Sequence, residues 1–229
     1  MLKKGAITTS IIIAGALASS NAVAAEPVFY TGLNAGWNAT EFEAMYEGTI
    51  GGNGVVTKET VSGSGAAYSG VVGVKFPIST GYLGMEVNIS DSGAEYEASE
   101  HVNGTKTLDQ TISSDLSYGV SGILAFNLNA HSQLYGIVGY QLTDVESKIA
   151  SRDLGTGQVT TDSNSDTFGG VRVGIGLETA ITSSVSARLE WKHTLYDSEE
   201  FEVATADGTL DAELEGNSNL ITLGFIGHF

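Results

Sequence analysis

The chain has 229 residues, with 27 Asp and Glu, 10 Lys and Arg, and no Cys. The net charge of −17 excludes a nucleic-acid partner, because phosphate binding needs a basic face. The absence of Cys excludes a disulfide framework and a Cys-ligated zinc site, and we expect no cofactor. Charged residues make up only 16% of the chain and 30 residues are Gly, which favours an all-β chain over long solvated helices.

Residues 1–25 have the form of a cleaved secretory signal peptide. Lys3 and Lys4 precede the apolar run 11–18, and the segment ends in the small residues Ala-Val-Ala-Ala. The apolar run is well short of the roughly 20 residues that a membrane-spanning helix needs. We therefore predict a signal peptide over 1–25 and a single mature domain over 26–229.

Strict alternation of apolar residues recurs in eight segments of the mature chain. In the first segment, Phe29, Leu33 and Trp37 fall on one face, whereas Tyr30 and Asn34 fall on the other. Interior Gly at this density would cost a helix about 1 kcal/mol each, so we predict strands. The eight predicted strands span residues 28–39, 67–76, 82–90, 115–127, 133–143, 167–178, 185–196 and 219–229.

The two faces of these strands differ in charge. The apolar face carries no Lys, Arg, Asp or Glu, and the charged strand residues all lie on the opposite face. A soluble sandwich would bury the apolar face and expose the charges to water, and period two alone does not distinguish the two arrangements. The charged strand residues are Lys75, Glu86, Asp115, Arg172, Glu178, Arg188, Glu190 and Lys192.

Two further patterns favour a barrel that crosses a membrane. Short turns alternate with long connections, as periplasmic turns alternate with outer loops in such barrels. Aromatic residues of the apolar face gather near the strand ends, as in the girdles at the two membrane interfaces. The predicted girdle residues are Phe29, Phe76 and Phe126 at one end and Trp37, Tyr68, Tyr118 and Tyr140 at the other.

We therefore predict an all-β fold, an eight-stranded antiparallel up-and-down transmembrane β-barrel in the outer membrane. A closed barrel pairs every backbone N–H and C=O within the bilayer without leaving a sheet edge. Both termini should lie on the periplasmic side. The four long connections should then be extracellular, and they span about 40–66, 91–114, 144–166 and 197–218.

The interior of an eight-stranded barrel is just wide enough for its own side chains. Buried charges persist when they are paired and hydrogen-bonded, so we expect a lumenal ion-pair network centred on Glu86, Arg172, Arg188, Glu190 and Lys192. One interpretation is a structural plug, and the other is a gate whose alternative pairings open a narrow ionic path. On either interpretation, Arg172→Ala should leave a carboxylate unpaired and destabilise the barrel.

The four long connections hold 22 acidic and 4 basic residues, and the last of them has no basic residue. Asn-Gly or Asp-Gly pairs near three loop centres are hairpin-turn signals, which predict strands that continue beyond the membrane as a rigid polar collar. One explanation of the acidic charge of these connections is solubility and repulsion between neighbouring protein molecules. Cation bridging to lipopolysaccharide or contact with a basic partner is the alternative.

The sequence offers no convincing metal or catalytic site. The fragment 162–166 is similar to the start of a calcium loop, but Thr167 stands where Gly is required. His193 lies on the lipid-facing side near the outer rim. Lipid A deacylase barrels carry a Ser two residues from such a His, whereas this chain has Leu195. We therefore expect no metal ligands, no catalytic residues and no enzymatic activity.

The strands over 134–140 and 186–192 and the closing segment 221–229 resemble those of the small outer-membrane β-barrel proteins. This family includes the OmpA transmembrane domain, OmpX and the opacity proteins, and the resemblance covers the whole mature chain. It implies that the barrel assembly machinery recognises Leu223, Phe225 and the terminal Phe229. Unlike full-length OmpA, the chain stops at Phe229, so cell-wall anchoring is not implied.

The expected role is a non-enzymatic scaffold for acidic surface loops, serving envelope integrity, surface contact or adhesion. A narrow gated porin for small solutes or ions is the first alternative, and a lipid-modifying barrel enzyme is the second. The expected partners are outer-membrane lipid, lipopolysaccharide, the barrel assembly machinery and an extracellular or host surface partner. We expect a monomer.

Overall fold

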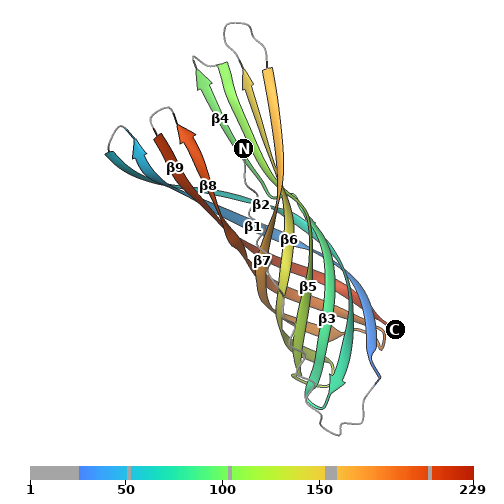
Figure 1. Ribbon diagram of the computed structural model, residues 1–229. Coiled ribbons are helices and arrows are strands. Elements are labelled where there is room, and N and C mark those ends of the chain that lie inside the picture. Colours follow the sequence, from blue (N-terminus) through green and yellow to red (C-terminus); the bar gives the residue numbers. More distant parts are fainter. Residues whose placement is uncertain (1–25, 51–52, 103–104, 153–158, 206–207) are drawn as a thin grey trace.

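The computed structural model describes most of the chain after residue 25, namely residues 26–50, 53–102, 105–152, 159–205 and 208–229. The predicted signal peptide lies outside these residues. Among them, no helix is long and apolar enough to cross a membrane. The described residues instead form nine antiparallel strands in one sheet (Figure 1). The strands are β1 (Val28–Ile50), β2 (Asn53–Ile78), β3 (Gly81–Ser92), β4 (Glu95–Val102), β5 (Thr105–Asn127), β6 (Ser132–Arg152), β7 (Val159–Ala180), β8 (Val185–Thr205) and β9 (Gly208–His228).

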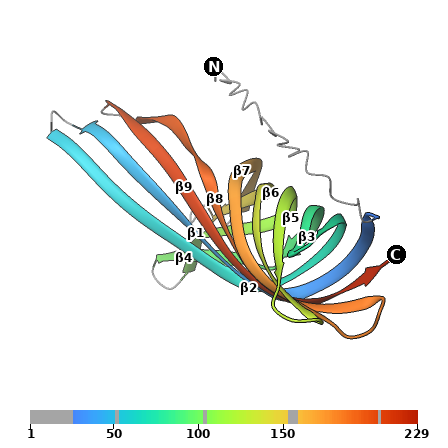
Figure 2. The same cartoon turned by 90° about the horizontal axis from the view of Figure 1, so that it is seen from below.

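Strands β3 and β4 occupy one position in the wall, because both lie between β2 and β5 and are separated only at Gly93 and Ala94. The wall therefore has eight positions. Strand β1 pairs with β2 from Val28–Lys75 onward and with β9 from Tyr30–His228 onward, which closes the sheet on itself (Figure 2). The predicted eight-stranded antiparallel barrel is confirmed.

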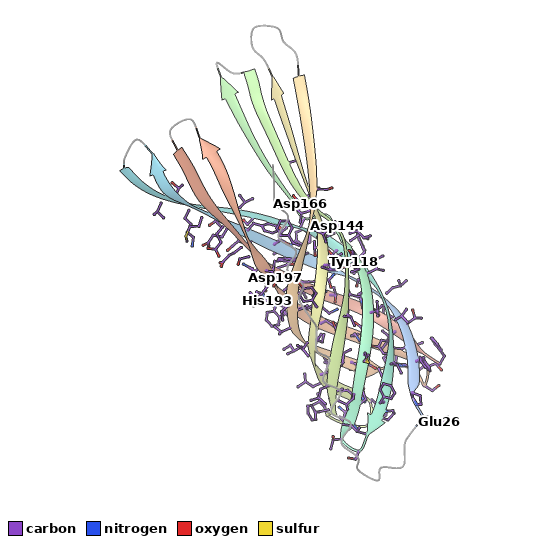
Figure 3. All side chains as sticks on the ribbon, viewed as in Figure 1. Glu26, Tyr118, Asp144, Asp166, His193 and Asp197 are labelled. Atoms are coloured by element: carbon purple, nitrogen blue, oxygen red, sulfur yellow. The ribbon has the colours of Figure 1, made fainter. Side chains whose placement is uncertain are left out.

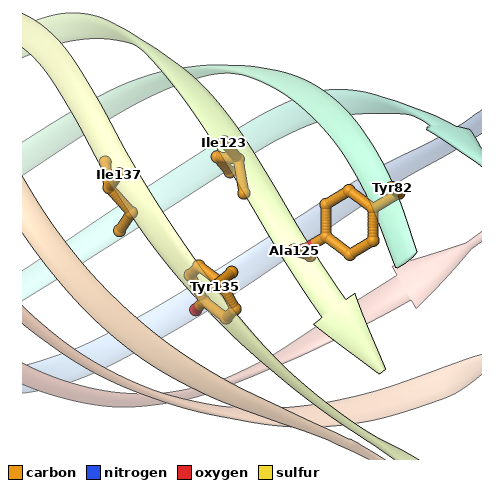
Figure 4. Close-up of a cluster of buried hydrophobic side chains, with 5 residues drawn as sticks. All are labelled: Tyr82, Ile123, Ala125, Tyr135 and Ile137. Atoms are coloured by element: carbon orange, nitrogen blue, oxygen red, sulfur yellow. The ribbon is translucent and has the colours of Figure 1, made fainter. Parts of the chain in front are cut away.

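The alternation places apolar side chains on the outside of the barrel, where sticks cover the outer wall in Figure 3. Leu33, for example, is 76% exposed, whereas its neighbour Asn34 is buried in the lumen. One side of the lumen departs from the expected polar lining, because β5 turns Ile123 and Ala125 inward. These residues belong to a buried apolar cluster near the periplasmic end (Figure 4), made of Tyr82, Ile123, Ala125, Tyr135 and Ile137.

Glycine on the inner face makes room for two large tyrosines. Tyr30 lies directly across from Gly73, and Tyr135 lies directly across from Gly176. A Cβ atom added at either glycine would collide with the ring of the facing tyrosine. The rings can therefore lie against the facing strand, inside a barrel too narrow to hold them otherwise.

Beyond the predicted membrane band, the four connections are mostly strand rather than loop. Strand pairing in the order β2-β1-β9-β8 continues almost to the hairpin tips, and so does pairing in the order β4-β5-β6-β7. In contrast, β7 and β8 part at Gly170–Tyr196, and β2 leaves its neighbour at Ser64–Glu95. The expected single collar is therefore replaced by two diverging four-stranded sheets (Figure 1).

The tyrosine–glycine packing can be tested with two Ala substitutions on β2. Gly73→Ala should lower the free energy of unfolding by about 1–3 kcal/mol, because the added methyl overpacks the Tyr30 ring. Gly70→Ala is the control, since its Cβ would face lipid at 3.7 Å from Ile89 Cγ2, an ordinary contact. Urea unfolding of the refolded barrel, followed by tryptophan fluorescence, measures both. Equal losses in the two variants would contradict this packing.

Candidate functional site

Arg188 on β8 is the hub of a buried cluster of charged side chains in the lumen. The residue is 1% exposed. Its Nη1 donates to Glu86 Oε2 at 2.5 Å and reaches Glu190 Oε1 at 3.5 Å, and its Nη2 reaches Glu178 Oε2 at 3.4 Å. Glu178 is the cross-strand neighbour of Arg188, and Glu190 is two residues along the same face. One guanidinium therefore joins carboxylates from β3, β7 and β8.

Two lysines extend this cluster. Lys75 Nζ lies 2.5 Å from Glu178 Oε1, and Lys192 Nζ lies 2.7 Å from Glu190 Oε2. Glu178 and Glu190 thus each contact two cations, which offsets the cost of burying an ionised carboxylate. We call the set of six residues the Arg188 cluster: Lys75, Glu86, Glu178, Arg188, Glu190 and Lys192.

Three inward tyrosines complete the hydrogen bonding of the carboxylates. The hydroxyl of Tyr30 donates to Glu86 Oε2 at 2.9 Å, and that of Tyr135 donates to Glu190 Oε1 at 2.8 Å. The hydroxyl of Tyr82 donates to Glu178 Oε2 at 3.4 Å. The guanidinium carbon of Arg188 also lies 5.1 Å from the Tyr30 ring centre and 5.3 Å from the Tyr135 ring centre, within cation–π range.

The alternation in the sequence does not by itself assign these tyrosines to the site. A signal was present, because Tyr30 and Tyr135 are large residues on a face otherwise rich in Gly and charge. Recognising it required the strand register, which sets each of them opposite a glycine.

Arg172 stands apart from the cluster among the eight predicted network residues, and the side chain of one other, Asp115, is not described. Arg172 faces the lumen as expected, but its Nε donates to Thr194 Oγ1 at 2.9 Å, and no described carboxylate lies within 4.0 Å of it. The expectation that Arg172→Ala would leave a carboxylate unpaired is therefore replaced by the loss of one hydroxyl contact. Asp115 lies where the pairing of β5 with β6 shifts register, and its side chain is outside the described set.

Aromatic rings cross the lumen on the extracellular side of the cluster. Phe42 on β1 lies 5.9 Å from Phe168 on β7 and 6.1 Å from Tyr196 on β8, between ring centres. The hydroxyl of Tyr196 is within 3.1 Å of Thr143 Oγ1 on β6. Since β8 and β9 separate β7 from β1 in the wall, these contacts span the barrel where β7 and β8 part.

The periplasmic end holds a polar cavity of about 360 Å³ that leads to the cluster. Lys75 and Glu178 form its inner wall, and His228 lies at its rim. The Nε2 atom of His228 is 3.0 Å from Ser186 Oγ and 3.6 Å from Glu178 Oε1. A small solute entering from the periplasm would meet this ion pair before it reached Arg188.

The predicted girdle and assembly residues lie on the outer wall. Leu223 and Phe225 are exposed on β9, and Phe29 and Phe229 exchange backbone hydrogen bonds of 3.2 and 3.0 Å where β1 meets the chain end. Among the girdle residues, Tyr140 is half-buried and donates to Asp197 Oδ2 at 2.6 Å, and the others are exposed: Phe29, Trp37, Tyr68, Phe76, Tyr118 and Phe126.

His193 lies near the outer rim, as expected from the sequence (Figure 3). Its ring stacks on Trp191 with centres 6.1 Å apart, and its Nδ1 is 3.0 Å from Asn219 Oδ1. The ring is thus held by an amide and an indole. In the part of the chain that the structure describes, no three His, Asp or Glu side chains are arranged to hold a metal ion.

Comparison with known proteins gives the family. The family model described as "Outer membrane protein beta-barrel domain" matches residues 9–229. No curated protein sequence matches the chain.

Solved structures of bacterial outer-membrane barrels are similar to this structure. The outer membrane protease OmpT from Escherichia coli has 10% identity over 88% of this chain and 97% of its own, with a TM-score of 0.50. The attachment invasion locus protein Ail of Yersinia pestis has 14% identity over 85% and 99%, with a TM-score of 0.34. OprG from Pseudomonas aeruginosa has 10% identity over 87% and 95%, with a TM-score of 0.43. At these identities the likeness concerns the fold alone.

The role of Arg188 as hub can be measured by removing its charge. Arg188→Met should lower the free energy of unfolding by about 3–5 kcal/mol, because it deprives three buried carboxylates of a shared cation. The control is Lys58→Met, which breaks a surface pair with Glu43 whose side chains are 55% and 29% exposed, and should cost less than about 1 kcal/mol. Denaturant unfolding of both variants checks this. If Arg188→Met cost no more than Lys58→Met, the cluster would not hold the barrel together.

Proposed function

The chain belongs to the outer-membrane β-barrel family, and we propose that it is a non-enzymatic scaffold that presents acidic β-sheets for contact at the cell surface. It is an integral protein of the bacterial outer membrane. One observation carries the proposal: the strands continue beyond the predicted membrane band as two separate four-stranded sheets.

These sheets reach far from the membrane. Strand β1 alone has about 11 residues beyond its predicted membrane segment, and at about 3.3 Å per residue they give an arm on the order of 35 Å. The arms also carry nearly all of the net charge, with 22 acidic and 4 basic residues in the four connections. An acidic arm of this length suits contact with a basic partner outside the lipid headgroups.

Each sheet ends in strand edges suited to binding. Within the described residues, β7 has no strand partner beyond Gly170 on its β8 side, and β8 has none beyond Tyr196 on its β7 side. Such edges present unpaired N–H and C=O groups, to which an extended segment of another protein can add as a further strand. The β8 edge over 197–205 contains four acidic and no basic residues, which favours a basic segment.

A narrow gated porin is the second candidate. The polar cavity at the periplasmic end favours it, because this cavity leads directly to Lys75 and Glu178. Beyond them the lumen is filled by the Arg188 cluster and then crossed by the rings of Phe42, Phe168 and Tyr196. The scaffold accounts for both the filled lumen and the extended arms, whereas the porin accounts only for the cavity.

The scaffold proposal can be tested by peptide binding to the refolded protein in lipid nanodiscs. The probe is an extended Lys-rich peptide, compared with the same peptide N-methylated at alternate amides. The edge variant combines Glu199→Gln, Glu200→Gln and Glu202→Gln on β8, and the control removes equal charge from β9, an inner strand of the same sheet, through Asp211→Asn, Glu213→Gln and Glu215→Gln.

We expect the edge variant to weaken binding at least tenfold and the β9 control to weaken it less. N-methylation should abolish binding, because it removes the amides that pair with the edge. Equal binding of the methylated peptide, or equal losses in the two variants, would show unspecific charge attraction and contradict binding at the edge.

A further inference from the structure

The polar cavity at the periplasmic end differs in charge from the rest of the molecule. The chain as a whole has a net charge of −17, but among the described residues Glu178 is the only acidic one that lines this cavity. Its Oε1 lies 2.5 Å from Lys75 Nζ, and its Oε2 lies 3.4 Å from both the Tyr82 hydroxyl and Arg188 Nη2. Both carboxylate oxygens are therefore occupied, and the negative charge of Glu178 is compensated within the protein.

The ammonium group of Lys75 has more donors than this ion pair uses. It carries three N–H groups, and Glu178 Oε1 accepts from one of them. The side chain is 6% exposed, and Nζ lies 4.7 Å from the Tyr82 ring centre and 5.1 Å from the Tyr30 ring centre. A ring face attracts a cation but carries no negative charge to neutralise it. Because Lys75 lines the cavity, its remaining donors can serve an anion that enters from the periplasm.

Amide side chains of the β5–β6 turn line the same cavity, and their acceptor atoms are already used. Asn127 Oδ1 accepts a hydrogen bond from Gln133 Nε2 at 2.8 Å. Asn129 Oδ1 accepts from the backbone N–H groups of His131 and Ser132 at 2.8 and 2.9 Å. The two asparagines therefore have their NH₂ groups left to donate to a ligand.

Two hydroxyl groups from the turn between β7 and β8 and from the start of β8 add further donors. Thr182 Oγ1 accepts from the backbone N–H groups of Ser184 and Val185, which leaves its O–H to donate. Ser186 Oγ lies 3.0 Å from His228 Nε2, and an Nε2–H donated by His228 likewise leaves the Ser186 O–H to donate. Ammonium, amide and hydroxyl donors thus surround one cavity of about 360 Å³.

We propose that this cavity is a binding site for a phosphate group, taken from the periplasm as inorganic phosphate or as a small phosphomonoester. A phosphate group offers at least three strong acceptor oxygens and a negative charge, which matches a lining of donors around one cation. Lys75 supplies the charge, and the neutral donors are Asn127, Asn129, Thr182 and Ser186. A carboxylate has only two oxygens and would leave more of these donors unpaired. The site is independent of the acidic sheets and goes beyond the scaffold role.

The experiment is isothermal titration calorimetry on the refolded barrel, residues 26–229, in a detergent without phosphate groups and at constant ionic strength. The probes are inorganic phosphate and glycerol 3-phosphate, and the controls are acetate and glycerol. We expect saturable binding of a phosphate probe, at least tenfold weaker binding of acetate and no binding of glycerol. Tighter binding of glycerol 3-phosphate would assign the site to phosphomonoesters, and equal or tighter binding of inorganic phosphate would assign it to the free ion.

Asn127→Asp tests the lining with little change of shape. The substitution keeps an oxygen that accepts from Gln133 but places a negative charge on the cavity wall, so the dissociation constant for phosphate should rise at least tenfold. Asn127 is exposed, so the barrel should still fold. The control is Asn217→Asp, which adds the same charge on β9 opposite Leu195, outside the cavity lining, and should bind phosphate as the wild type does.

Lys75→Met removes the cation and should abolish phosphate binding, and Asn127→Asp keeps the test valid if Lys75→Met fails to fold. Four results would each overturn the proposal. They are no saturable phosphate binding by the wild type, equal binding of acetate and phosphate, equal dissociation constants for Asn127→Asp and Asn217→Asp, or undiminished binding by folded Lys75→Met.

Discussion

The structure depends first on one constraint, that lipid offers no hydrogen bonds to the backbone. Every N–H and C=O within the membrane band must pair inside the protein, and closing the sheet achieves this. Strand β1 does so by pairing with both β2 and β9. Closure over eight wall positions leaves a narrow lumen that side chains must fill. This lack of space explains why glycines line the inner face where tyrosine rings lie against the wall. It also explains why several carboxylates share the one guanidinium of Arg188.

The constraint ends where the membrane ends, and the chain then behaves differently. Water can pair with a free strand edge, so the wall no longer has to close, and β7 and β8 part at Gly170–Tyr196. The barrel becomes two open sheets at this level. The rings of Phe42, Phe168 and Tyr196 lie near the boundary and separate the polar lumen from the surface. Under the proposed function, one part of each strand fills the lumen and another part presents a surface for binding.

The sequence predicted the barrel because alternation and the one-sided placement of charge are local patterns. It also selected the residues of the Arg188 cluster, since only the inner face carries charge. Which charges meet depends on register and stagger, which a single sequence does not display. The sequence pattern therefore groups Arg172 with carboxylates that in the structure contact Arg188, Lys75 and Lys192. The sequence also does not predict the split into two sheets. Hairpin-turn signals show where the chain turns, but they do not show which neighbouring strands separate.

We infer that the Arg188 cluster seals the lumen and that the function belongs to the outer sheets. Single-channel recording in planar bilayers tests it most directly, with the wild type beside Arg188→Ala and insertion verified separately. We expect a silent wild type and discrete conductance steps in the variant, because the variant loses the side chain that joins three glutamates across the lumen. Conductance steps in the wild type that Arg188→Ala leaves unchanged would contradict a lumen sealed by Arg188 and favour the porin.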